Sequence, residues 1–178
     1  MKNVIHHTAL ISESAKIGKG NYIGAYTIIH DNVIIGDNNY IGDHCIIGDI
    51  GESINYFNTE KKGVTIGHNN RFTKQVTIDS GTINATIIRD NCLILKNGHV
   101  GHDSYLLDNV QIRCNAIVGG HCILNNDVIL CLNSVIQPRI TAPKGAMIGA
   151  MSNVTKKSKL IDNHVHYGNP CKPIRLRN

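Results

Sequence analysis

The N-terminal part of the chain carries an isoleucine at every sixth position. An α-helix repeats close to every 3.6 residues and a strand every 2, so neither places every sixth residue alone on a buried stripe. A six-residue period is typical of a coil of short parallel strands, the hexapeptide β-helix. The stripe consists of Ile5, Ile11, Ile17, Ile23, Ile29, Ile35, Ile41 and Ile47.

After two interruptions the stripe continues as far as Val154, with a change of frame before Ile88. Small residues often stand two positions before a stripe residue and glycine often follows it, as tight corners between short strands favour. Three hexads make one triangular coil, so equivalent positions recur every 18 residues. The pattern predicts an all-β fold, with residues 1–178 forming a single domain, a parallel β-helix of about seven coils.

The interruptions of the stripe are candidate functional segments. The first, at about residues 49–63, is polar, and we expect it to protrude from the prism and bind substrate, since long loops on compact scaffolds are often functional. The second, at about 81–85, is shorter. Residues 155–178 follow the repeat and are expected to form a short cap, in which Pro170 and Pro173 disfavour a helix.

Composition narrows the function. The chain has 178 residues and a net charge of +5, with two Phe, six Tyr and no Trp. No base-stacking aromatic pattern accompanies the positive charge, so we expect no nucleic-acid partner. No apolar stretch suits a signal peptide or a membrane span, which predicts a cytoplasmic protein. The six cysteines lack CxxC spacing and are expected to be reduced, with Cys45, Cys92 and Cys122 filling the interior.

The segment Asn97-Gly-His-Val-Gly-His-Asp103 carries the candidate chemistry. His102 is followed by Asp103, and a carboxylate beside an imidazole orients the ring and stabilises its protonated form, as a general base requires. Gly120 lies 18 residues after His102 and is therefore expected one coil away, beside His121. A glycine lets a reacting carbonyl approach a backbone N–H, as an oxyanion hole requires.

The hexads resemble the left-handed β-helix of the hexapeptide acyltransferases. Residues 47–126 resemble the UDP-N-acetylglucosamine O-acyltransferases, through the stretches 46–82 and LKNGHVGHDS (95–104). The resemblance implies a left-handed coil and a homotrimer with active sites between subunits. It also implies that His102 is the base, Asp103 its partner and Gly120 the oxyanion donor. The substrate contacts it implies are Tyr56, Asn58, Asn97, His99 and His121.

Other parts of the chain depart from those O-acyltransferases. Ser53 and Asn55 replace an acidic and a basic substrate contact, Gln137-Pro138 replaces a His-Gln pair, and the helical C-terminal domain is absent. The stretches IGAMSNVTKKS (148–158) and YGNPCKPIR (167–175) instead resemble the ends of acetyl-CoA-dependent hexapeptide transferases. That resemblance implies acyl-CoA as co-substrate, no metal, and a cofactor site made by Asn133, Ala150, Lys156, Lys157 and Lys172.

Together these features resemble the N-acyltransferases that modify nucleotide-linked amino-deoxysugars of bacterial O-antigen and lipopolysaccharide. The expected reaction is direct transfer of an acetyl or short acyl group from acyl-CoA to an amino group of a dTDP-linked sugar. Three alternatives stay open. They are an acyl-carrier-protein-dependent sugar O-acyltransferase, a zinc enzyme resembling γ-carbonic anhydrases with His99, His102 and His121 as ligands, and a non-catalytic scaffold.

Overall fold

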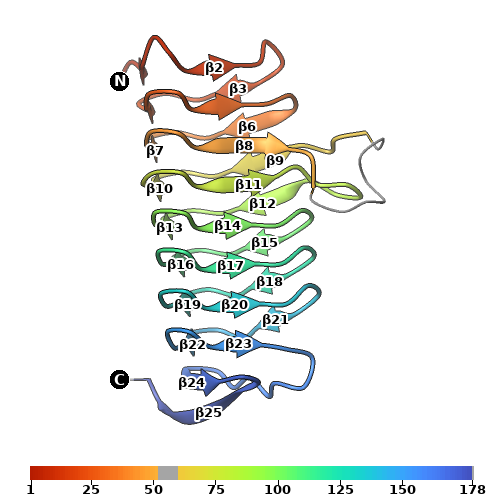
Figure 1. Ribbon diagram of the computed structural model, residues 1–178. Coiled ribbons are helices and arrows are strands. Elements are labelled where there is room, and N and C mark those ends of the chain that lie inside the picture. The colour runs from red at the N-terminus through yellow and green to blue at the C-terminus, as the bar shows by residue number, and fades with distance from the viewer. Residues whose placement is uncertain (52–59, 178) are drawn as a thin grey trace.

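The protein is a triangular prism of short parallel strands, seen in a computed structural model that describes residues 1–51 and 60–177 (Figure 1). No helix occurs among these residues, and the all-β expectation is confirmed. The chain descends the prism as a left-handed coil, crossing one face after another, with the N-terminus at one end and the C-terminus at the other (Figure 1). Each complete turn of the β-helix contributes one strand to each of three sheets.

The first sheet continues to the C-terminal end of the prism. Its last two strands, β24 and β25, are antiparallel, and all its other pairs are parallel. In spatial order it contains β1 (Val4–Ile5), β4 (Tyr22–Ile23), β7 (Tyr40–Ile41), β10 (Arg71–Phe72), β13 (Leu93–Ile94), β16 (Gln111–Ile112), β19 (Ile129–Leu130), β22 (Met147–Ile148), β24 (His164–Gly168) and β25 (Cys171–Leu176).

The second and third sheets are wholly parallel. The second contains β2 (Leu10–Ile11), β5 (Ile28–Ile29), β8 (Ile46–Asp49), β11 (Thr77–Asp79), β14 (His99–Val100), β17 (Ile117–Val118), β20 (Val135–Ile136) and β23 (Asn153–Val154). The third contains β3 (Lys16–Ile17), β6 (Val33–Ile35), β9 (Val64–Ile66), β12 (Thr86–Ile88), β15 (Tyr105–Leu106), β18 (Ile123–Leu124) and β21 (Thr141–Ala142). Over the described chain the three sheets have ten, eight and seven strands, so the prism has more coils than the roughly seven expected from the sequence. The C-terminal segment adds β24 and β25 to the first sheet.

The isoleucine stripe fills the interior of the prism. From Ile23 to Val154 the stripe residues have almost no exposed surface. Cys45, Cys92 and Cys122 are buried among them as expected, and burial raises the pKa of the Cys45 thiol to about 11 and that of Cys92 to about 12. These thiols are therefore protonated fillers of the core, because the thiolate is the reactive form.

The corner that follows the second sheet repeats one geometry on successive coils. Asp103, His121 and Arg139 occupy equivalent places there, with φ of 57°, 57° and 65°. The backbone N–H of His121 donates to the carbonyl of His102 (2.8 Å), and that of Arg139 donates to the carbonyl of Gly120 (2.9 Å). We call this edge the second corner. Its register places residues 18 apart directly above one another.

The two interruptions leave the prism at the second corner on successive coils, since β8 pairs with β11 and β9 with β12, and they meet outside it. The first departs after Asp49 and returns at Val64, and its residues 52–59, including Tyr56 and Asn58, lie outside the described residues. Gly63 and Gly81 form an antiparallel bridge between the two interruptions, with an N–H of Gly81 donating to Gly63 (3.0 Å). The second interruption is thereby held against the base of the first.

The C-terminal cap is a β-hairpin. β24 pairs in parallel with β22, and β25 folds back on β24. The expectation that no helix forms here is confirmed. The hairpin covers the last coil, since Tyr167 packs closely over Gly149. Over the described chain, no helix is long and apolar enough to cross a membrane.

The interior stripe should dominate stability. Leu106 is fully buried and Leu10 is 64% exposed, so the same substitution at both sites isolates burial. We expect Leu106→Ala to lower the free energy of unfolding by about 2–5 kcal/mol, because it removes packed methyl groups and leaves a cavity. Leu10→Ala should change it by less than about 0.5 kcal/mol. Urea unfolding at one fixed protein concentration measures both, and equal losses would contradict an interior held together by this stripe.

Candidate active site

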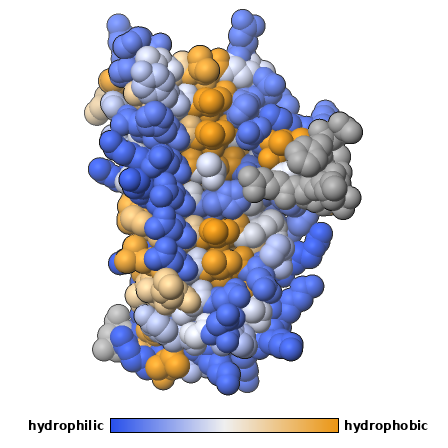
Figure 2. Space-filling model, viewed as in Figure 1, coloured by the Kyte–Doolittle hydropathy of each residue, from blue (hydrophilic) through white to orange (hydrophobic). Residues whose placement is uncertain are grey.

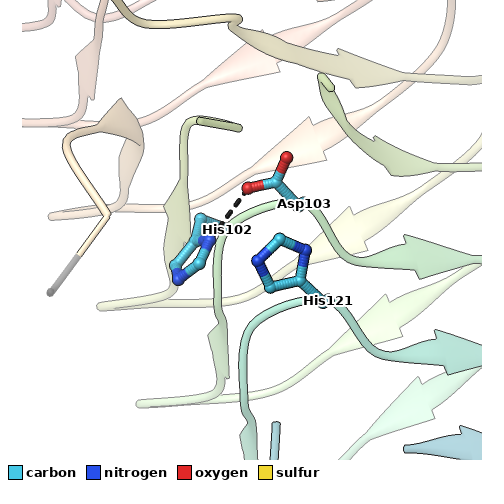
Figure 3. Close-up of side chains that lie close together, drawn as sticks. All are labelled: His102, Asp103 and His121. Carbon is cyan, nitrogen blue, oxygen red and sulfur yellow. Dashed lines mark hydrogen bonds and ion pairs between the residues drawn. The ribbon is translucent and has the colours of Figure 1, made fainter. Parts of the chain in front are cut away.

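His102 and Asp103 form a hydrogen-bonded pair at the second corner. Nδ1 of His102 lies 2.8 Å from Oδ2 of Asp103 (Figure 3). The His102 side chain is 13% exposed and that of Asp103 only 2%. The geometry is that of an imidazole oriented by a carboxylate, with Nδ1 of the ring facing the acid, as a general base requires.

The second interruption surrounds the Asp103 carboxylate with donors. Oδ2 accepts hydrogen bonds from the backbone N–H (2.9 Å) and the hydroxyl (2.7 Å) of Thr82. Oδ1 accepts from the N–H groups of Ile83 (2.8 Å) and Asn84 (2.7 Å). The N–H of Asp103 itself donates to Oγ1 of Thr86 (2.9 Å). The carboxylate is therefore held in one orientation by a loop that is inserted between two hexads of the repeat.

This environment keeps Asp103 ionised. Burial acts to raise the pKa of the carboxyl, but hydrogen bonds from Asn84, His102 and Thr82 outweigh it and hold the pKa far below its usual range. A carboxylate that accepts several N–H bonds is stabilised in its charged form. Asp103 can thus stabilise a positive charge on His102 throughout the neutral pH range.

Two glycines pack against the imidazole of His102. A Cβ on Gly120 would lie 2.7 Å from Nε2 of the ring, and a Cβ on Gly51 would lie 3.0 Å from its Cγ and Cδ2. Neither position tolerates a side chain without moving the ring. Within the described chain the N–H of Gly120 makes no backbone hydrogen bond outside the strands. Gly120 thus combines close approach to the base with an N–H suited to an oxyanion, as the spacing of 18 residues predicts.

His121 lies beside His102 on the next coil. The two rings meet edge to face, with centroids 4.9 Å apart and planes at 85° (Figure 3). Nε2 of His121 is buried and has no hydrogen-bond partner among the described residues. Burial lowers the pKa of His121, with Arg139 and His102 acting in the same direction against Asp103. The ring is therefore held neutral at the wall of the site.

Comparison with known proteins agrees with the repeat. Residues 3–49 match the family described as bacterial transferase hexapeptide (six repeats). This match covers the first coils of the prism, where the isoleucine stripe is unbroken. The acyl-[acyl-carrier-protein]–UDP-N-acetylglucosamine O-acyltransferase of Paracoccus denitrificans is 37% identical over 102 residues, which is 56% of this chain and 39% of that relative. The match thus spans well under half of the curated relative.

Solved structures match more of this hexapeptide-repeat chain. The UDP-N-acetylglucosamine acyltransferase from Campylobacter jejuni is 28% identical with a TM-score of 0.79, covering 97% of this chain and 74% of that one. The enzyme of the same name from Bacteroides fragilis is 25% identical with a TM-score of 0.76, over 97% and 74%. Both similarities support the fold.

The structure does not gather all the predicted substrate residues around His102. His99 lies one face earlier, on β14, where Nδ1 is 2.8 Å from Oγ1 of Thr77 and Nε2 is 3.7 Å from Oδ2 of Asp79. Asn97 lies at the preceding corner and donates to Asn115 (2.9 Å). The roles of these residues remain predictions, as do those of Tyr56 and Asn58.

The zinc alternative is not supported by the grouping of ligands. His99 is oriented by Thr77 and Asp79. The potential metal-ligand atoms that lie within 4.8 Å of one another belong to His102, Asp103 and His121. The Asp103 carboxylate in this group is already saturated by four hydrogen bonds from the second interruption and one from His102. The arrangement suits a hydrogen-bonded base better than a three-histidine metal centre.

Two of the predicted cofactor residues share a hollow. Lys156 and Lys157 line a space of about 320 Å³ together with Gln137, Thr155 and Pro170. Asn133 and Ala150 are separated from it, because they lie on successive coils at the preceding corner, where the N–H of Met151 donates to Leu132. Lys172 lies on β25, paired with Tyr167. The structure therefore assembles only the two neighbouring lysines into one site.

Sequence reasoning missed the residues that hold Asp103. Thr82, Ile83 and Asn84 lie in an interruption that has no periodicity, and three of their four contacts come from backbone N–H groups, which leave no trace in side-chain identity. Gly51 was also missed. The available signal was that the two breaks in the repeat fall at the same corner of successive coils.

Asp103 should make stability depend on pH. The pKa of Asp103 is lowered in the folded state. Its contribution to the free energy of unfolding is therefore complete above the unfolded-state pKa of about 3.9 and is lost as the pH falls below that value. We expect Asp103→Asn to unfold at a lower urea concentration than the wild type at neutral pH. The difference between the two urea midpoints should narrow between about pH 5 and about pH 3. Asp162→Asn, on the exposed cap, is the control. A gap that stays constant or widens on acidification would contradict this account.

Proposed function

We propose that this protein is an acyltransferase that acylates a nucleotide-linked sugar, with His102 as general base. The observation that carries the proposal is the pairing of His102 with an ionised Asp103 directly over Gly120. The names of the similar proteins, which are acyltransferases acting on UDP-N-acetylglucosamine, support the same reaction class.

The proposed reaction is direct transfer. A hydroxyl or amine of the acceptor attacks the carbonyl carbon of an acyl thioester as Nε2 of His102 takes the acceptor's proton. Asp103 stabilises the resulting imidazolium, and the N–H of Gly120 donates to the tetrahedral oxyanion. Collapse breaks the carbon–sulfur bond, and the departing sulfur receives the proton from His102. General-base catalysis contributes about 10²–10⁴-fold and one oxyanion donor about 10²–10³-fold in comparable enzymes.

The comparisons favour an acyl carrier protein as donor and a hydroxyl group as acceptor. The relative from Paracoccus denitrificans is named as an acyl-carrier-protein-dependent O-acyltransferase. This is the alternative of the sequence analysis rather than its first expectation of an acyl-CoA-dependent N-acyltransferase. Because the match spans 39% of that relative, the donor and acceptor of this chain are part of the proposal.

A second candidate, acyl-CoA-dependent N-acylation, is favoured by the position of the lysine hollow. His102, Gly120, Pro138 and Lys156 follow one another at intervals of 18 residues along the second corner. Three strand spacings of about 4.8 Å therefore separate the levels of His102 and Lys156, about 14 Å in all. An extended pantetheine arm could span such a distance, with Lys156 and Lys157 as point charges for the CoA phosphates.

A homotrimer with active sites between subunits is also part of the proposal. Outward-facing residues of the second sheet form two apolar stretches above and below the level of Thr77 and His99 (Figure 2). Ile117 in the lower stretch is 41% exposed. Apolar patches that flank a polar site are typical of interfaces between protein chains. The two stretches are Leu10, Ile28 and Ile46, and Ile117 and Val135.

A thiol-release assay tests the proposed function. Acyl-carrier-protein and CoA thioesters are each combined with UDP-N-acetylglucosamine and with a dTDP-linked amino sugar. We expect one combination to release thiol and form an acylated sugar, and His102→Ala to lower kcat by about 10²–10⁴-fold. His7→Ala, an exposed histidine far along the chain, should match the wild type. Absence of transfer with every combination, or a His102→Ala variant as active as the wild type, would refute the proposal.

The lysine hollow gives a separate prediction about the donor. If acyl-CoA is used, Lys156→Ala and Lys157→Ala should each raise KM for acyl-CoA about two- to fivefold, the effect of losing one exposed ionic contact. KM for the acyl-pantetheine fragment, which lacks the nucleotide phosphates, should not change. Lys159→Ala, an exposed neighbour, is the control. Equal effects on both donors would show that these lysines do not contact the CoA phosphates.

A further inference from the structure

A small hollow with both polar and apolar walls lies on the second sheet, next to the catalytic corner. It has a volume of about 120 Å³ and is lined by residues of β8, β11 and β14 and by Ile50. A water molecule occupies about 30 Å³, so the hollow suits one polar substituent of a ligand and not a whole sugar ring. Its polar walls are Asp49, Thr77, Asp79 and His99.

The hollow adjoins the general base. Thr77 pairs with His99 and Ile78 with Val100, so the register places Asp79 next to Gly101, the residue before His102. On the other side, Ile50 lines the hollow, and a Cβ on the following Gly51 would lie 3.0 Å from the His102 ring. The hollow therefore borders the His102 ring.

Asp79 gives the hollow an acceptor in a nearly buried position. Its side chain is 9% exposed, and its carboxylate lies 3.7 Å from Nε2 of His99. Nδ1 of His99 is in turn 2.8 Å from the hydroxyl of Thr77, which fixes the ring. The other carboxylate, Asp49, is 52% exposed and lies 3.6 Å from Nζ of Lys61. Asp79 is therefore the less exposed of the two carboxylates that line the hollow, and the one better placed to accept a hydrogen bond from a ligand.

We propose that Asp79 selects an amino group over a hydroxyl group as the acceptor atom. This rests on the proposed acyl transfer at His102. A primary amine has two N–H groups and a lone pair, so it can donate one proton to His102, donate the other to Asp79 and still attack the thioester. A hydroxyl has one proton, which His102 must take, and its oxygen would then face the Asp79 carboxylate without a donor.

The step is balanced for the amine. The nitrogen forms a bond to the acyl carbon, the carbon–sulfur bond breaks, and one amine proton passes through Nε2 of His102 to the departing sulfur. The second N–H stays on the product amide and remains bonded to Asp79. The proposed acceptor class is a nucleotide-linked amino-deoxysugar, in contrast to the O-acyltransferases that the chain resembles.

The test compares two acceptors that differ at one atom, a nucleotide amino sugar and its hydroxyl counterpart at the same carbon. We expect the wild type to prefer the amine in kcat/KM on the order of 10²-fold or more, as sites with a buried polar partner do. Asp79→Asn should lower kcat/KM for the amine on the order of tenfold and leave the hydroxyl acceptor unchanged or improved. Asp162→Asn, an exposed carboxylate on the cap and outside the hollow, is the control.

Each outcome decides the inference. The inference is overturned if the wild type has the higher kcat/KM with the hydroxyl acceptor, or if Asp79→Asn lowers kcat/KM by the same factor with both acceptors. The wild-type ratio decides even if the variant does not fold. If neither acceptor is acylated, the proposed function fails, and calorimetric binding of the two acceptors to wild type then tests the hollow by itself. Tighter binding of the amine, abolished in Asp79→Asn, supports the inference, and equal binding of the two acceptors overturns it.

Discussion

Vertical register is the constraint on which the rest of this structure depends. Each coil hydrogen-bonds to the next with an offset that keeps equivalent residues stacked, as in the pairing of His99 with Ile117 and of Val100 with Val118. A solenoid of this kind has contacts only between neighbouring coils, so a local change propagates along one edge and not across a globular core. Because of this register, a base on one coil can meet a backbone N–H on the next without any long-range tertiary packing.

The catalytic corner combines that regular scaffold with one irregular element. A buried carboxylate is costly unless it is fully hydrogen-bonded. The repeat alone cannot supply the donors, since its backbone groups are used in the sheets. The second interruption provides them, with Thr82, Ile83 and Asn84 converging on Asp103. Function at this corner thus depends on a departure from the hexad pattern placed at the same corner, one coil before the base.

Most of the fold and part of the site could be predicted from the amino-acid sequence. The six-residue period defines the interior stripe, the buried cysteines and the stacking of Gly120 on His102, because all three follow from periodicity alone. The backbone donors around Asp103 could not be read, since an N–H is common to nearly every residue type. Asn97 is a substrate contact that the resemblance implies; the structure places it at the preceding corner, bonded to Asn115, and its role stays a prediction. Asp79 was overlooked because it stands 23 positions before His102 and the register brings it back alongside Gly101.

The central claim is that Asp103 fixes His102 with Nδ1 protonated and Nε2 available to accept a proton. Nitrogen-15 chemical shifts of the His102 ring, measured above the pH at which it titrates, report the tautomer directly. The account predicts a protonated Nδ1 and an unprotonated Nε2 in the wild type. It also predicts loss of that preference in Thr82→Val combined with Asp103→Asn. A neutral wild-type ring that carries its proton on Nε2 would contradict it.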